Sequence, residues 1–179
     1  MSEFLDREAI VELLTQLGAR LDRRGLSAEV YDVGGTAMLL AYNRTKLTRD
    51  VDAVTEDEAV VEREARDMAR ERRGLAEDWF NSRVRPMLPR VFDADQVEVL
   101  AVPGISVSVA SPRHMLAMKT RAARGDRDTE DILLLCEVLG ITSISAALAV
   151  ADEVWGPGMV RDESVFLVSE ALRGAGFSD

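Results

Sequence analysis

The chain has 179 residues, 47% of them hydrophobic and 30% charged, which suits one folded domain, or one domain with a small appended bundle. No apolar run approaches the ~20 residues that a membrane-spanning helix needs, and the first residues lack the basic region of a signal peptide, so we expect a cytoplasmic protein. One His and one Cys exclude a structural zinc site and a disulfide framework. The net charge of −10 argues against a large nucleic-acid footprint, although basic residues gather between positions 66 and 127.

The first 74 residues alternate between helical and strand patterns. Apolar residues at helical spacing predict a helix over 2–24. A strand over 28–33 follows, ended by Gly34-Gly35, and then a short buried helix over 36–42. Alternation of polar and apolar residues predicts a second strand over 49–54. A helix over 55–74 would begin with Thr55 as its cap and end at a glycine.

The remainder predicts one hairpin and then helices. Residues 77–88 resemble a short helix broken at Pro86, and strands over 96–102 and 105–110 flank a Pro-Gly turn. Four helices follow, the first with Ser111 at its cap and Pro112 at its first position: 111–123, 127–140, 144–155 and 162–174. The fold class is therefore α/β (α+β), with a small mixed sheet flanked by helices in 1–110 and a C-terminal helical cluster in 111–179, packed as a single compact domain.

The turn Gly34-Gly35 stands between a strand and a helix start. Glycine lets the backbone approach a ligand closely, and the unpaired N–H groups of a first helical turn point at an anion. The chain has no Walker loop and no dinucleotide fingerprint. The turn is a candidate phosphate site, and a plain tight turn is the commoner meaning of a glycine pair.

Asp50 and Asp52 are the strongest site signal. Residues i and i+2 of a strand share a face, so the two carboxylates would lie side by side. Buried paired carboxylates need cations or protons, and Mg²⁺, with Mn²⁺ as the alternative, is the usual partner. Glu98, in the middle of a strand, is the best-placed third carboxylate for ligation or for taking a proton, although a lone strand Glu is commonly surface-facing. A phosphate site beside such a cluster indicates metal-assisted phosphoryl or nucleotidyl chemistry.

These residues resemble a known family. Gly34-Gly35, fourteen residues, and then Asp-Val-Asp-Ala from Asp50 resemble the signature of the polymerase-beta-like nucleotidyltransferases. "NRTKLTRD" is similar to the R-x-T-x-D run of the minimal, AbiEii-type members found in bacterial toxin–antitoxin systems, and "EDWFNSRV" to a Trp-hydrophobe-Asn segment of one branch of them. "SPRHMLAMKTRAARGDRDTEDILLL" resembles a further stretch of that group, so the resemblance covers about Val33 to Leu135.

The resemblance implies a polymerase-beta-like core and a role for each matching residue. Gly34, Gly35 and Thr36 would hold the triphosphate, and Asp50 and Asp52 would bind Mg²⁺. Lys119 would reach the phosphates, although its spacing alone suits a surface lysine. The remaining candidates each have a purely structural alternative. Asp128 or Asp131 would complete the site, or would instead complement a helix dipole. Arg44 and Arg49 would stabilise the phosphates, or would instead form ordinary ion pairs.

The leading functional hypothesis is transfer of a nucleoside monophosphate from NTP to a hydroxyl, which in the family belongs to a tRNA 3′ end or to a protein side chain. A cognate antitoxin or toxin protein is the implied partner, and no membrane is involved. Two alternatives stay open: a catalytically idle protein-binding half of a two-component system, and an NTP sensor that binds without transfer.

Overall fold

The computed structural model describes residues 4–42 and 47–179, with only the backbone of residues 126 and 127. The described chain divides into two compact units. The first unit consists of residues 1–87 and 96–110, and the second of residues 88–95 and 111–179.

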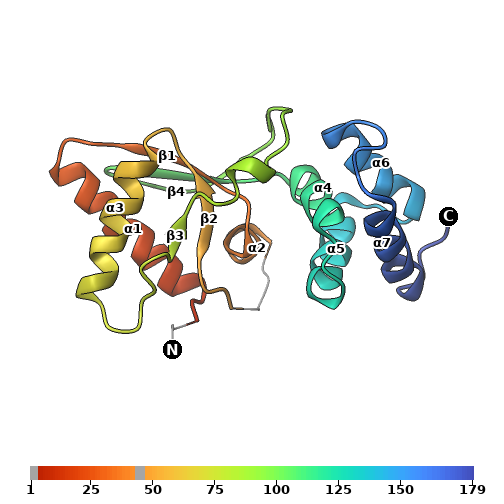
Figure 1. The fold of residues 1–179 in the computed structure, drawn as a ribbon, viewed down its shortest axis with the longest axis horizontal. Helices are drawn as coiled ribbons and strands as arrows, with labels where there is room; N and C mark the ends of the chain where they lie inside the picture. The colour runs from red at the N-terminus through yellow and green to blue at the C-terminus, as the bar shows by residue number, and fades with distance from the viewer. Residues whose placement is uncertain (1–3, 43–46) are drawn as a thin grey trace. The chain divides into compact units, whose positions relative to one another are not determined.

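A mixed five-stranded sheet forms the centre of the first unit (Figure 1). Its strands are β1 (Ala28–Asp32), β2 (Val51–Val54), β3 (Phe80–Asn81), β4 (Val97–Val102) and β5 (Ile105–Val109), in the spatial order β3-β2-β1-β5-β4. The pairs β1–β5 and β2–β3 are parallel, and β1–β2 and β4–β5 are antiparallel. The prediction of a small mixed sheet in an α/β chain is therefore confirmed.

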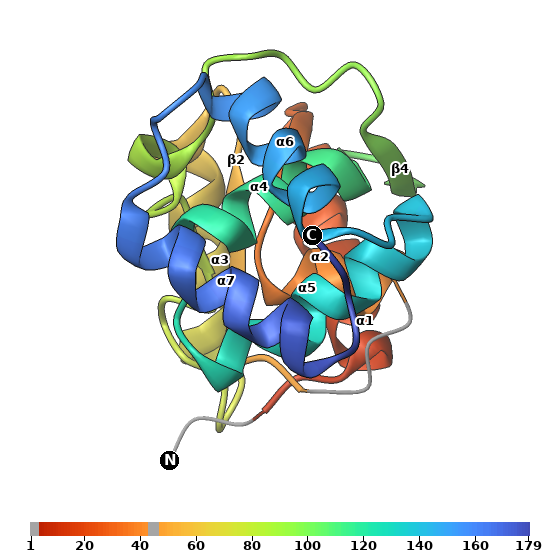
Figure 2. The same ribbon diagram turned by 90° about the vertical axis from the view of Figure 1, so that its right-hand side faces the viewer.

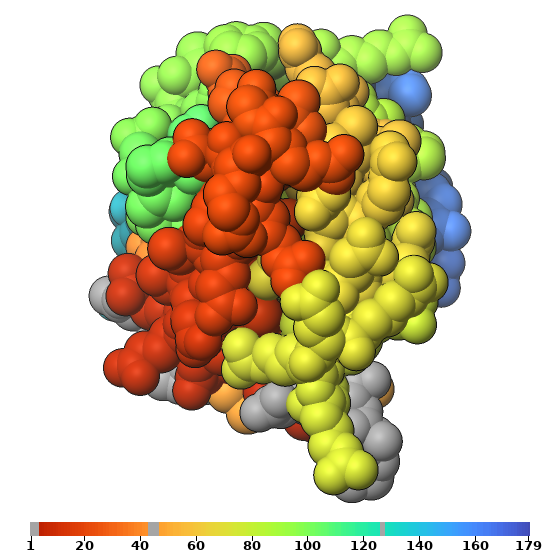
Figure 3. Space-filling model, turned by 90° about the vertical axis from the view of Figure 1, so that its left-hand side faces the viewer, coloured from red at the N-terminus to blue at the C-terminus, as the bar shows by residue number. Residues whose placement is uncertain are grey.

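Three helices belong to this unit: α1 (Arg7–Arg23), α2 (Gly35–Ala41) and α3 (Glu58–Glu71). α1 begins where the Asp6 side chain accepts a hydrogen bond from the Ala9 amide at 2.8 Å. Its apolar stripe is buried, and it packs against α3 and against β5. α1 and α3 lie side by side on one face of the molecule (Figure 3).

The sheet buries one face and leaves the other partly open. Along β1 and β5 the residues that face the helices are buried, among them Val30 and Val107. Residues of the opposite parity, such as Tyr31 and Ser108, are half-buried. Because side chains alternate along a strand, the half-buried Asp52 of β2 belongs to this open face.

The turn between β4 and β5 sets the distance between α1 and the sheet. Gly104 has φ +82°, and a side chain there would overlap the carbonyl oxygen of Gly18 in α1. Gly18 in turn packs directly against Ile105. The helix and the hairpin therefore meet backbone to backbone, which only glycine allows.

Residues 77–88 do not form the predicted short helix. Phe80 and Asn81 form β3, parallel to β2, and Arg85–Met87 form one 3-10 turn (η1). Trp79 decides this conformation, because its side chain is fully buried and its indole N–H donates to the Ala65 carbonyl at 2.8 Å. Its own carbonyl accepts from the Val51 amide at 2.6 Å. Burial of one large side chain thus overrides a local helical pattern.

The helix predicted from Thr55 begins later. α3 starts at Glu58 with Asp57 at the N-cap position. Thr55 is buried, and its carbonyl accepts a hydrogen bond from Arg85 at 2.7 Å, which ties it to the loop after β3. The prediction of Thr55 as the cap was wrong for that reason.

The second unit contains four helices in its described residues: α4 (Pro112–Ala122), α5 (Asp126–Leu139), α6 (Ile144–Trp155) and α7 (Asp162–Gly174) (Figure 2). α4 packs against each of the other three. The predicted cap is confirmed, since the Ser111 side chain accepts from the His114 amide and Pro112 occupies the first turn. Within the described residues no helix combines the length and the apolar character needed to cross a bilayer.

Candidate functional site

The glycine turn and the aspartate pair are brought together by the β1–β2 pairing. Asp32 at the end of β1 lies opposite Ala53, and one step further the Val33 amide donates to the Asp52 carbonyl at 3.2 Å. The chain then turns at Gly34 into α2. Two segments separated by more than a dozen residues in the sequence therefore meet at one end of the sheet.

Gly34 contacts Asp52 so closely that no larger residue fits. A methyl group on Gly34 would lie 2.8 Å from Asp52 Cβ and 2.9 Å from Asp52 Oδ2. The φ of Gly34 is −92°, which any residue adopts, so the close approach explains the glycine. The Gly34 amide donates to Asp32 Oδ1 at 3.1 Å, which leaves the amides of Gly35 and Thr36 as the candidates for a phosphate.

Asp50 is fixed through its backbone. The hydroxyl groups of Thr36 and Thr48 both donate to the Asp50 carbonyl, at 2.9 and 3.1 Å. Burial raises the pKa of the Asp50 carboxyl, and the neighbouring Asp52 raises it further, while Arg83 acts in the opposite direction. Thr36 is fully buried, and its hydroxyl group is used in the hydrogen bond to the Asp50 carbonyl.

Asn81 adds an amide to this cluster, although its place in the sequence pattern predicted no role for it. It lies directly opposite Asp52 in the β2–β3 pair, is 5% exposed, and its Nδ2 is 3.5 Å from Asp50 Oδ2. The Trp-hydrophobe-Asn resemblance was the available signal. Only the pairing of β3 with β2 shows which residues Asn81 meets.

Asp32 is a second residue that the sequence analysis missed. Its side chain is fully buried, and Oδ2 has no hydrogen-bond partner among the described residues. Burial raises the pKa of Asp32 to about 8. The negative charge of Asp52 also raises this pKa, and the hydrogen bond from the Gly34 amide lowers it. The available signal was parity, because Asp32 follows Ala28 and Val30 at the buried positions of the strand.

Glu98 is not brought to the aspartate pair. It is exposed on β4 and lies opposite Ser108 of β5, which lies opposite Tyr31 of β1. Since β1 separates β5 from β2, Glu98 and Asp52 are three strand spacings apart, roughly 14 Å. Ligands of one ion lie far closer together than that.

The two predicted arginines have different outcomes. The Arg49 guanidinium lies over the Phe4 ring, 4.6 Å from its centroid, and the residue is exposed next to Asp50. Arg44 lies outside the described residues, so its predicted phosphate contact stays a prediction.

Lys119, Asp128 and Asp131 form one buried cluster in the second unit. The Lys119 ammonium contacts Asp128 Oδ1 at 2.9 Å and Asp131 Oδ2 at 2.8 Å, and both carboxylates are 1% exposed. Arg124 also binds Asp128, through its backbone amide and its side chain. Burial acts to raise the pKa of Asp128, but Lys119 and Arg124 outweigh it and hold the pKa below its ordinary value. The structure thus joins Lys119 to both of the candidate acids, Asp128 and Asp131.

The donor set suits a divalent cation that is shared with a substrate. In the described residues no group of three or more His, Cys, Asp and Glu side chains could enclose a metal ion. Mg²⁺ is usually held by one or two carboxylates together with substrate phosphates and water. Asp50 and Asp52, beside a glycine turn, provide that number.

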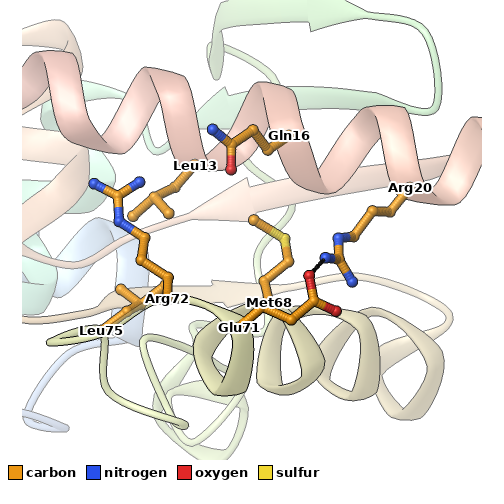
Figure 4. Close-up of a pocket in the computed structure, with 7 residues that line it drawn as sticks. All are labelled: Leu13, Gln16, Arg20, Met68, Glu71, Arg72 and Leu75. Carbon is orange, nitrogen blue, oxygen red and sulfur yellow. Dashed lines mark hydrogen bonds and ion pairs between the residues drawn. The ribbon is translucent and has the colours of Figure 1, made fainter.

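A groove of about 200 Å³ lies elsewhere in the first unit, between α1 and α3 (Figure 4). An ion pair between Arg20 and Glu71 crosses it, and Arg72 pairs with Glu12. Because its charged residues are all engaged in ion pairs and none of the candidate site residues lines it, we do not assign the site to this groove. Its lining residues are Leu13, Gln16, Arg20, Met68, Glu71, Arg72 and Leu75.

Comparison with models of protein families, with curated proteins and with solved structures gives no match in any of the three. The candidate site is therefore defined by the residues and geometry of this chain alone.

Proposed function

We propose that the chain is a metal-dependent nucleotidyltransferase with a polymerase-beta-like core, which transfers a nucleoside monophosphate from NTP to a hydroxyl group of a tRNA or a protein. The contact between Gly34 and Asp52 carries the proposal, because it places a glycine turn directly against one of two adjacent carboxylates. A phosphate-binding turn and a cation-binding pair have to be neighbours if one triphosphate is to use both.

Each part of the site has a definite task in this proposal. The amides of Gly35 and Thr36 would bind triphosphate oxygens, and Asp50 and Asp52 would hold Mg²⁺. When bound, that ion would supply neutralisation of the charge that develops on the leaving pyrophosphate. The hydroxyl groups of Thr36 and Thr48 hold the Asp50 backbone, so its carboxylate is positioned before the substrate arrives.

The setting that we propose is a two-component system of the toxin–antitoxin kind, with a cognate protein as partner. The acidic surface, with a net charge of −10, suits a protein partner or a short RNA end better than a long RNA.

The test is transfer of α-³²P label from each of the four NTPs, with Mg²⁺, into total tRNA and into protein, beside an Asp50→Ala, Asp52→Ala double variant. Label in one fraction that disappears in the double variant is the expected result. It would give the base preference and the acceptor class together.

A second candidate is an NTP sensor or an idle binding partner. The observation that favours it is the pairing of Lys119 with Asp128 and Asp131, because this charge is already neutralised within its own unit. Metal-dependent NTP binding without any label transfer would favour the sensor. Absence of both binding and transfer would favour the idle partner.

A further inference from the structure

Asn81 stands where the neighbouring strand meets the aspartate pair. β3 has only two residues, and the second is in register with Asp52. Residues paired across neighbouring strands project to the same face of a sheet, so Asn81 shares the partly open face with Asp52. It is nevertheless 5% exposed, so its amide faces protein groups.

The orientation of the amide is set by its hydrogen bonds. Asn81 Oδ1 accepts from the Arg83 backbone amide at 3.2 Å. The remaining group, Nδ2, then faces the Asp50 carboxylate at 3.5 Å and the Asp78 carbonyl at 3.5 Å. An amide N–H is a donor, so Asn81 presents a neutral donor to Asp50.

The segment that carries Asn81 is rigidly anchored. Trp79 is fully buried, with its indole N–H on Ala65, and the Ser82 amide and hydroxyl both donate to Glu62, at 2.9 and 2.6 Å. Side chains on both sides of Asn81 thus fix its place. Such support is what a site residue requires and an ordinary surface residue lacks.

We propose that Asn81 is the third residue of the aspartate site: a positioning residue whose amide N–H holds the Asp50 carboxylate in place beside Asp52. This inference rests on the proposed function. Behind the same glycine turn, Oδ2 of the buried Asp32 has no hydrogen-bond partner among the described residues.

Substitution of Asn81 by Asp tests whether position 81 lies within reach of the cation, and substitution by Ala tests the donor to Asp50. Asp keeps the size and the acceptor for the Arg83 amide, removes the donor to Asp50 and adds a third carboxylate beside the pair. Affinity for a divalent cation rises with the number of charged ligands, so we expect N81D to bind Mn²⁺ about ten-fold more tightly than the parent chain. N81A removes the donor without adding charge and should bind Mn²⁺ several-fold more weakly.

The measurement is Mn²⁺ binding to the full chain, without nucleotide, from the electron paramagnetic resonance signal of free Mn²⁺. Thermal melting of each variant shows that it is folded at the temperature used. Ala101→Asp is the matched control: it adds the same charge at an exposed position of β4, three strands from β2, and should leave the affinity unchanged. A purely structural role would lower the melting temperature and leave the Mn²⁺ affinity of the folded protein unaltered.

The outcomes separate this proposal from the proposed function. If Asp50→Asn, Asp52→Asn abolishes a Mn²⁺ site while N81D and N81A bind like the parent chain, the role of Asn81 is overturned and the metal site stands. If the parent chain has no Mn²⁺ site that this double variant removes, both fail. An equal gain in N81D and A101D would reduce the effect to overall charge and would also overturn the role of Asn81.

Discussion

Gly34 and Asp52 are in contact in the candidate site, and Gly34→Ala tests this contact. The added methyl group would lie 2.8 Å from Asp52 Cβ, so either the turn or the carboxylate must move. We expect a loss of about 1–3 kcal/mol in the free energy of unfolding, as for other overpacked sites. We also expect a fall in label transfer of about 100-fold, since a displacement of about 1 Å costs that much in a catalytic site.

Urea unfolding and the ³²P assay measure the two effects of Gly34→Ala. Gly174→Ala is the control, because a methyl group at Gly174 in α7 meets nothing within 4 Å. Unchanged activity in G34A would show that the contact has no part in the reaction.

Asp32 should make the stability of the chain depend on pH. Its pKa is raised from 3.8 to about 8, so between these values the folded chain keeps a proton that the unfolded chain has released. The free energy of unfolding contributed by this group therefore falls as pH rises through that window, by at most about 1.4 kcal/mol per pH unit. Below pH 4 both states hold the proton and the group has no effect.

Asp32→Asn removes this dependence and keeps an acceptor for the Gly34 amide. The stability advantage of D32N over the parent chain should grow from pH 5 to pH 8 in urea titrations. Asp22→Asn, at an exposed position of α1, is the control and should follow the parent curve. A constant difference between D32N and the parent chain across this range would contradict a raised pKa.

Some site residues could be predicted from the sequence, and others could not. The Asp-Val-Asp spacing and the glycine pair were visible because they are local patterns, and the structure places them together. Asp32 and Asn81 needed knowledge of which strands are neighbours, and Glu98 was misjudged for the same reason: its distance from Asp52 depends on the strand order.

Among the helices, α4 and α5 are joined through the Lys119 ion pairs, and Lys119→Met tests what this pairing contributes to the free energy of unfolding. Lys119→Met would remove the ammonium that contacts both Asp128 and Asp131, each 1% exposed, while Asp128 would keep its contacts with Arg124. Breaking a buried pair by removing one partner costs about 3–5 kcal/mol, so we expect a loss of that size in urea unfolding.

Arg124→Met is the matched control for Lys119→Met. Its side chain binds Asp128 but is 55% exposed, so its removal should cost less than about 1 kcal/mol. Adding D128N and D131N to K119M should recover most of the loss. If K119M and R124M were equally mild, the buried cluster would not carry the stability assigned to it.

Regular elements were predictable in proportion to their length. The helical periodicities of α1 and α4–α7 and the Ser111 cap of α4 lie within single segments, so the sequence was sufficient to place these helices, to within about five residues at the start of α1. β3 could not be found that way, because two residues have no periodicity. Its existence depends on the burial of Trp79 and on hydrogen bonds to a strand almost thirty residues earlier.

The net charge of the whole molecule limits how many phosphate groups of an RNA acceptor the protein could contact. With 32 acidic and 22 basic residues, we expect an acceptor RNA to be held near its end, through about two phosphate contacts. We therefore expect tRNA labelling at subsaturating RNA to fall by less than about ten-fold between 50 and 200 mM salt. A steeper fall would indicate a larger basic footprint, and label found only in protein would exclude an RNA acceptor.

The backbone contact between Gly104 and Gly18 has a consequence for anyone who wishes to engineer this chain. Hairpin tips are the usual places for tags, fluorophores and inserted domains, because they ordinarily face solvent. Here the tip of the hairpin packs directly against α1, so an insertion would separate the helix from the sheet. The turn at Gly158 between α6 and α7, where an added Cβ meets nothing within 4 Å, is the better point of attachment.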